Sequence, residues 1–385
     1  MSLFTGVSPR DTGIVNNISA LAPDAITLAE HFHDAGYETF AAVSITHLSF
    51  ATSGPGQGFD RMNVAEQPLD SSETFALADR WLKASSQRPV FLWIHVFDAH
   101  APYLPPEGYR RLYYPKDQDP FDKSLKRLGQ RVTPSWLKGL RDLKYPQALY
   151  KSEITYLDEQ MRGFYSGSRF EQGLTVMTAD HGEALGGHNI WFEHKGLFPN
   201  TLSVPLIIKG PGVPPGVTST SAVTLLDVGR TMLDLCDLES AVHPGRNLLE
   251  LHETPSDQPR FSLAAHGAEA SVTLGPWHLM LHIVPPSDSR YETHQVRLYH
   301  LERDPACLED LVASESARSA RLRTLLVDWL VSARPVGWNV LETEALDADE
   351  LEALESLGYA AGERNTRSNE WFDAACECER CWPYH

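Results

Sequence analysis

"GLTVMTADHGEALGGHNIWFEHK", residues 173–195, joins an apolar segment to a polar one that is rich in histidine and glycine. The apolar part, 173–180, is typical of a strand that is buried on both faces within a sheet. Asp180 and His181 come at its end. Because ligands of open α/β sheets bind beyond the carboxyl ends of the strands, this density of carboxylate, imidazole and ammonium groups predicts a site for a metal ion and an anion.

The rest of residues 1–255 alternates between strand and helix patterns. Strand patterns cover 38–45, 89–97 and 204–210, and helix patterns cover 24–36, 71–85, 145–166 and 224–236. The apolar faces of two of these helices are predicted to contain Ile26, Leu28, Ala29 and Phe32, and Ile154, Leu157, Met161 and Phe164. The alternation predicts an α/β fold, a mainly parallel sheet sandwiched by helices.

The pattern changes after residue 255. Four short strand patterns follow closely on one another, and a helix pattern covers 316–332. We therefore expect a large α/β domain over 1–255 and a small C-terminal α+β subdomain over 256–340, built as an antiparallel sheet with one helix. Residues 341–385 are expected to form a peripheral tail.

Composition narrows the classes of partner. The chain has 385 residues, 42% of them hydrophobic, and a net charge of -18, which disfavours binding to nucleic acid and to anionic lipid. No apolar run reaches the ~18 residues that a membrane span needs. An anionic substrate would need local positive charge, which a bound cation can supply. Compartment and oligomeric state stay open.

Three predicted strands deliver polar side chains to one edge of the sheet. His47 follows the strand at 38–45, His100 follows the strand at 89–97, and Asp180 with His181 follows the third. A carboxylate alone favours calcium or magnesium, whereas an imidazole admits zinc or manganese. The alternative is that Asp180 caps a turn and His181 lies on the surface.

The other polar residues near these strand ends each carry two interpretations. Lys195 binds an anionic oxygen and offsets charge on a leaving atom, or it is a solvated charge. His100 donates a proton or hydrogen bond to a leaving oxygen, or it is a turn histidine. Glu183 is a partner of the metal ligands, which we favour, or a surface charge. His95 is assigned to the core. For His194, a loop position and a site position are equally supported.

Three of the five cysteines crowd the C-terminus as "CECERC". Cys376, Cys378 and Cys381, with His385 as a fourth group, have ligand types that zinc accepts. Because terminal segments are commonly mobile, we favour an unstructured tail over a metal site.

Eight segments in order resemble the sulfatases (arylsulfatase-like) of the alkaline phosphatase superfamily. They are "SLFTGVSPRDTGI", "TLAEHFHDAGYETFA", "GQGFD", "HVFDAHAPYLPP", "TADHGEALGGH", "VPLIIKGPGV", "YHLERDPACLEDL" and "LEALESLGY". The resemblance implies hydrolysis of a small-molecule or carbohydrate sulfate ester. It also implies a divalent metal, usually calcium, and a formylglycine nucleophile made from Cys or Ser.

The resemblance also implies roles for individual residues. Asp180 and His181 would be metal ligands, and Lys195 and His100 would contact the sulfate and its leaving oxygen. His47 matches the His of the family segment Gly-Lys-Trp-His-Leu, in which Ile45 replaces the Lys.

One family segment has no counterpart. The sequence contains no Cys-x-Pro-Ser-Arg, and its first cysteine is Cys236. We therefore expect a chain truncated at its N-terminus, without its first strand, two further metal-binding Asp residues and the nucleophile, and inactive alone. The alternatives are a phosphodiesterase or phosphonate monoester hydrolase of the same superfamily, and a non-catalytic remnant or binding module.

Overall fold

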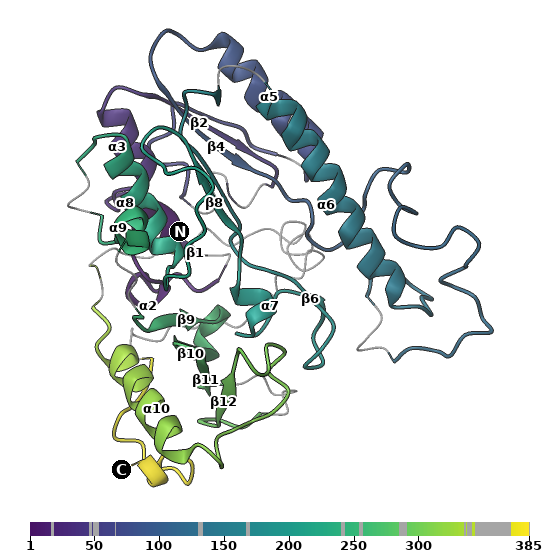
Figure 1. The fold of residues 1–385 in the computed structure, drawn as a ribbon, viewed down its shortest axis with the longest axis vertical. Helices are drawn as coiled ribbons and strands as arrows, with labels where there is room; N and C mark the ends of the chain where they lie inside the picture. The colour runs from purple at the N-terminus through teal and green to yellow at the C-terminus, as the bar shows by residue number, and fades with distance from the viewer. Residues whose placement is uncertain are drawn as a thin grey trace.

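A computed structural model describes most of the chain (Figure 1). The described residues are 1–16, 19–45, 48, 54–65, 67–129, 134–166, 170–239, 243–253, 257–284, 291–334, 336, 341–342 and 371–384. Within them, no helix has the length and apolar character that crossing a membrane requires.

The larger part is organised around strands that follow the expected order. A three-stranded parallel sheet has the order β3-β2-β4, with β3 at Arg61–Met62, β2 at Glu38–Val43 and β4 at Val90–His95. A second pair, β5 (Thr175–Thr178) and β8 (Leu206–Lys209), is antiparallel. The prediction of an α/β fold with a parallel sheet is confirmed, and within the described residues the β5–β8 pair forms a separate antiparallel sheet.

Helices cover both faces of these strands, as Figure 1 shows. On one side lie α3 (Leu28–Asp34) and α8 (Leu225–Leu235), and on the other lie α5 (Ser71–Ala84) and α6 (Lys144–Tyr165). Helix α3 begins at a capping box, in which the Thr27 side chain accepts from the Glu30 backbone. Such a cap satisfies backbone N–H groups that the first helical turn leaves unpaired.

Two details of the predicted helix faces are wrong. Ile26 precedes α3 and is 55% exposed, and Ile154 on α6 is 45% exposed. The face that α6 buries contains Leu149, Glu153 and Tyr156 instead. The spacing of apolar residues identified the helix. The buried face differs from the predicted one because it includes the polar residues Ser152 and Glu153.

Three apolar runs, 89–97, 173–180 and 204–210, are typical of strands buried on both faces, and the strands that the first two form are less buried than expected. In the described part of the chain, β4 pairs with β2 alone and β5 with β8 alone. Phe91 is the one fully buried residue of β4, and all four residues of β5 are half-buried. Each strand has a hydrogen-bonded neighbour on one side, which explains the partial exposure of two apolar segments.

The C-terminal part is the predicted antiparallel sheet with one helix. Its strand order is β12-β11-β10-β9, with every pair antiparallel. The strands are β9 (Arg260–Leu263), β10 (Glu269–Leu274), β11 (Trp277–His282) and β12 (Val296–His300), and the helix is α10 (Ser316–Val331). Leu279 and Leu298 of the sheet and Leu326 of α10 are fully buried in their common core.

Residues 371–384 differ from the peripheral tail that we expected. Trp371, Phe372 and Cys381 are buried in the core of the C-terminal sheet and α10. The Trp371 indole donates a hydrogen bond to the Arg10 carbonyl, at 2.8 Å. This segment is therefore a packed part of the C-terminal subdomain.

The remaining elements are short. They are α1 (Ser2–Thr5), α2 (Pro9–Thr12), β1 (Ser19–Ala20), β6 (Ala184–Leu185), β7 (Trp191–Glu193), α7 (Pro199–Leu202), α9 (Leu248–Glu253), β13 (Leu341–Glu342) and the 3-10 helices η3 (Ala265–Gly267) and η4 (Trp382–Tyr384). Strands β6 and β7 form a hairpin directly after Asp180 and His181, and β1 pairs with β13.

Candidate functional site

The ends of β4 and β5 bring their polar side chains together. The ring centroids of His100, which follows β4, and His181, which follows β5, are 5.9 Å apart. The backbone N–H of His181 donates to the Asp180 carboxylate at 2.9 Å. These three predicted site residues therefore share one region. His47 lies outside the described residues.

A third histidine, His194, completes the group. Strand β7 ends at Glu193, and the His194 ring stacks on that of His181 with centroids 4.2 Å apart. Its centroid is 5.0 Å from that of His100. The sequence leaves the place of His194 undecided, because β7 is three residues long and carries no strand pattern. His194 follows a strand end, as His100 and Asp180 do, but only the structure shows that strand.

Backbone carbonyls determine the tautomers of two rings. Nδ1 of His181 lies 2.9 Å from the Gly182 carbonyl oxygen, and Nδ1 of His100 lies 2.6 Å from that of Ala101. A carbonyl oxygen accepts only, so each Nδ1 carries the proton and each neutral ring has its lone pair on Nε2. One nitrogen from each of the three rings lies within 4.8 Å of the others.

Burial keeps two of these imidazoles neutral. It is the main cause that lowers the pKa of His100 to about 4. Burial, together with the neighbouring His181 and His100, lowers the pKa of His194 to about 3. At neutral pH both rings therefore present lone pairs rather than positive charge, a state suited to metal coordination.

Asp180 supplies the negative charge of the group. Solvent reaches 73% of its side chain. Although solvent reaches this side chain, the many protein atoms around it desolvate the carboxyl and raise its pKa. His181, His95 and backbone hydrogen bonds outweigh that effect, and the pKa lies below its ordinary value. His95, assigned to the core from the sequence, is the last residue of β4 and contacts the Ser44 hydroxyl at 3.0 Å.

Lys195 and Glu183, the two remaining candidates, contact side chains outside the histidine group. The Lys195 ammonium pairs with Glu193 at 2.9 Å, and the two side chains are 59% and 43% exposed. Lys195 is still close enough to lower the pKa of His194. Glu183, expected beside the metal ligands, lies beside the Tyr103 hydroxyl, and burial raises its pKa to about 7.

Gly182 allows the turn after His181 to approach α7. Its N–H donates to the Thr201 carbonyl at 2.8 Å, and a Cβ there would lie 2.1 Å from the Asn200 carbonyl oxygen. Gly182→Ala is expected to lower the free energy of unfolding by about 1–3 kcal/mol, because backbone must move to admit the methyl group. Denaturant unfolding measures the change.

Gly108→Ala is the matched control, since a Cβ at Gly108 meets nothing within 4 Å. Equal stability of the two variants would contradict the close approach at Gly182.

The donor types of this group fit a divalent cation. One carboxylate with up to three imidazoles suits zinc or manganese, whereas calcium prefers about six to eight oxygen ligands. The formylglycine that the resemblance implies has no cysteine precursor beside this group. The five cysteines of the chain are Cys236, Cys307, Cys376, Cys378 and Cys381, and none of them belongs to the histidine group.

Comparison with known proteins gives one consistent result. A family model described as Sulfatase matches residues 1–238. The "Uncharacterized sulfatase YidJ" of Escherichia coli (strain K12) is 25% identical over 303 residues, which are 65% of this chain and 60% of the relative. The chain thus spans less than two thirds of that relative's length.

Solved structures share the fold. One is a protein in complex with its substrate D-glucosamine-2-N,6-O-disulfate (TM-score 0.65, 16% identity, 85% of this chain and 86% of the other). Another is the phosphonate monoester hydrolase of Agrobacterium radiobacter (TM-score 0.63, 18% identity, 84% and 83%). At these identities the likeness concerns the fold alone.

Proposed function

This chain belongs to the sulfatase family, and from this premise we propose that Asp180, His181, His100 and His194 form the sulfate-binding end of a sulfuric ester hydrolase site. The substrate class is a small-molecule or carbohydrate sulfate ester. The structural relative that binds a disulfated glucosamine supports a sugar.

The observation that carries the proposal is an anionic carboxylate beside three mutually close imidazoles. A sulfate group would be repelled by Asp180 alone, and neutral lone pairs do not attract it. In our proposal Asp180 and Nε2 of His181 hold a divalent cation. That cation would neutralise the carboxylate and polarise a sulfate oxygen.

His100 and His194 are assigned to the sulfate itself. Because Nδ1 of His100 donates to the Ala101 carbonyl, Nε2 is the atom that would face a sulfate oxygen. It can donate there only after it takes up a proton. A bound anion favours the protonated ring, so that His100 can hold a proton near the leaving oxygen. Lys195 would join them by exchanging Glu193 for the anion.

Binding is the property that we test first. Isothermal titration of the chain with sulfate, in the presence of zinc or manganese, is expected to show a metal-dependent affinity. His181→Ala should weaken this affinity for sulfate at least about tenfold. Tenfold is the lower limit found when a group that only supports a metal ligand is removed, and His181 is assigned as a ligand itself.

The control is His33→Ala, on the half-exposed side chain of α3 that contacts Asp60. Sulfate affinity that is equal in the wild type and in His181→Ala would contradict the assignment.

Turnover separates this proposal from its alternatives. We propose that these 385 residues, which contain no Cys-x-Pro-Ser-Arg, bind sulfate without hydrolysing 4-nitrophenyl sulfate. Hydrolysis that disappears in Lys195→Ala would overturn this. Hydrolysis of a phosphonate ester but not of the sulfate ester would favour the phosphonate monoester hydrolase. Sulfate binding without turnover of either ester agrees with the proposal for the chain alone.

A further inference from the structure

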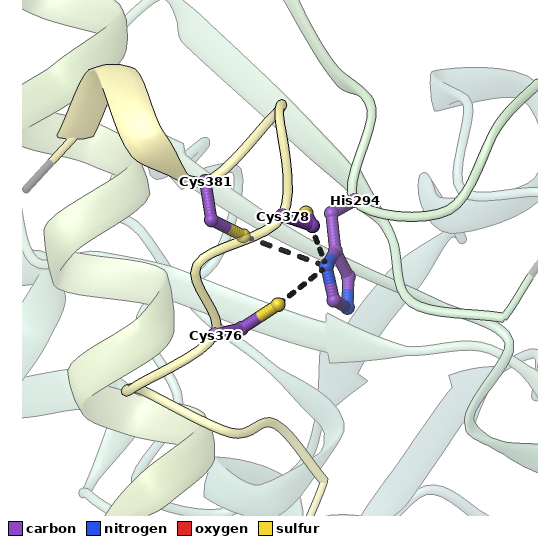
Figure 2. A group of neighbouring side chains, drawn as sticks. All are labelled: His294, Cys376, Cys378 and Cys381. Carbon is purple, nitrogen blue, oxygen red and sulfur yellow. Dashed lines mark hydrogen bonds between the residues drawn. The ribbon is translucent and has the colours of Figure 1, made fainter.

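The C-terminal cysteines meet a histidine that lies far away in the sequence, as Figure 2 shows. Nδ1 of His294 is 3.3 Å from Sγ of Cys378, 3.4 Å from Sγ of Cys381 and 3.5 Å from Sγ of Cys376. All four atoms lie within 4.8 Å of one another. None of these three cysteines is in a disulfide bond.

Hydrogen bonds cannot account for this arrangement. A neutral imidazole nitrogen carries either one proton or one lone pair, so Nδ1 can satisfy one sulfur and not three. A cation at the centre satisfies all four atoms at once. In a tetrahedral zinc site, Zn–S bonds of about 2.3 Å and Zn–N bonds of about 2.0–2.1 Å place nitrogen and sulfur about 3.5 Å apart. The observed separations of 3.3–3.5 Å match that geometry.

The local fold holds the thiols in place. The backbone N–H of Cys376 donates to the Asp373 carbonyl at 3.1 Å, and that of Cys381 donates to the Cys378 carbonyl at 2.9 Å. These turns direct the side chains inward. His294 enters from the loop before β12, and its own N–H donates to the His282 carbonyl at 2.6 Å.

A buried arginine gives an independent indication that the cysteine group carries negative charge. Arg323 of α10 is 7% exposed, and its Nη2 donates to Sγ of Cys381 at 3.2 Å. A buried guanidinium needs an anionic partner, and a neutral thiol is a weak acceptor. Three thiolates, a neutral imidazole and Zn²⁺ sum to one negative charge, which Arg323 offsets.

We propose that Cys376, Cys378, Cys381 and His294 bind one structural zinc ion. The three thiols lose their protons to solvent as three Zn–S bonds form, and Nδ1 of His294 supplies the fourth bond. All four positions are taken by protein ligands, which is typical of a structural rather than a catalytic site. The ion would attach residues 371–384 to the C-terminal subdomain. His385, considered as the fourth ligand from the sequence, lies outside the described residues.

Metal analysis of the purified full-length chain tests the proposal. We expect one zinc ion held by the thiolates, besides any cation at the histidine group. Its replacement by cobalt(II) should produce a thiolate-to-cobalt charge-transfer band. Cys378→Ser should abolish that band. Cys378 is exposed, so its replacement removes little packing.

Two controls separate this site from others. Cys236→Ser, on a half-buried cysteine outside the group, should keep the zinc and the cobalt band. His181→Ala should keep the band as well, since the histidine group of the proposed sulfate site contains no thiolate. A band that vanishes in His181→Ala but persists in Cys378→Ser would overturn the proposal.

A second measurement uses the wild type alone, in case the Cys378 variant fails to fold. A thiol-specific mercurial should release the zinc as the clustered thiols react. A chelator should lower the melting temperature, which zinc restores and calcium does not. A disulfide among Cys376, Cys378 and Cys381, with no zinc bound, would overturn the proposal.

Discussion

Replacing Asp227 by alanine is expected to lower the free energy of unfolding by about 3 kcal/mol, the lower end of the range for breaking a buried ion pair. The Asp227 carboxylate is 2% exposed and accepts from the backbone N–H, Nε and Nη2 of Arg246 at 2.8–3.0 Å. It also accepts from the N–H of Thr224, as part of the capping box that begins α8. The variant leaves the partly buried Arg246 guanidinium without its anion.

Denaturant unfolding of the wild type and Asp227→Ala measures this loss. Asp158→Ala is the matched control, since the Asp158–Arg162 pair on α6 is 67% and 80% exposed. Exposed pairs of this kind contribute about 0–1 kcal/mol. A loss in Asp227→Ala no larger than that of the control would show that the buried pair does not hold α8 in place.

Glu153→Gln is expected to raise the free energy of unfolding at pH 7 by about 3 kcal/mol. Glu153 lies on the buried face of α6 and is 5% exposed. Burial, with a smaller contribution from the nearby Asp98, raises the pKa of its carboxyl from 4.5 to about 9. The Leu104 N–H donates to Oε1, which lowers the pKa by less. The side-chain amide of the variant would keep an acceptor oxygen for that N–H and cannot ionise.

Proton binding by Glu153 determines how the stability difference between the two proteins changes with pH. Below the unfolded-state pKa of about 4.5, both states hold the proton and the two proteins differ little. As the pH rises towards 9, unfolded Glu153 releases its proton while folded Glu153 keeps it, so the wild type loses stability progressively. The advantage of Glu153→Gln should therefore grow between pH 5 and pH 8.

Urea unfolding at pH 5, 6, 7 and 8 gives this dependence. Glu107→Gln, on an exposed residue, is the control and should follow the wild type at every pH. A constant difference between Glu153→Gln and the wild type would mean that Glu153 is ionised in the folded protein.

The elements of this fold could be read from local patterns. Apolar runs and helical spacing predicted β2, β4, β5, α5 and the C-terminal sheet within a few residues of their bounds. The same patterns missed the antiparallel direction of β8 and the exposed side of Ile154, because both depend on which neighbours the element meets.

The residues of the candidate site also fall into those that the sequence could group and one that it could not. Asp180, His181 and His100 could be grouped from the sequence, because ligands of α/β folds bind beyond the carboxyl ends of the strands, and each of these residues follows a strand end. His194 could not, because its place comes from the ring contact with His181 across a hairpin too short to leave a pattern.

By itself the sequence determined the α/β class, the family and the strand ends at which chemistry is possible, since these follow from residue order over short distances. The tertiary structure alone decided which distant groups share an environment. His294 meets Cys376 from 82 residues away, and Arg323 meets Cys381 from 58 residues away. Such pairings arise from the packing of β11, β12 and α10 around one core, which no local pattern contains.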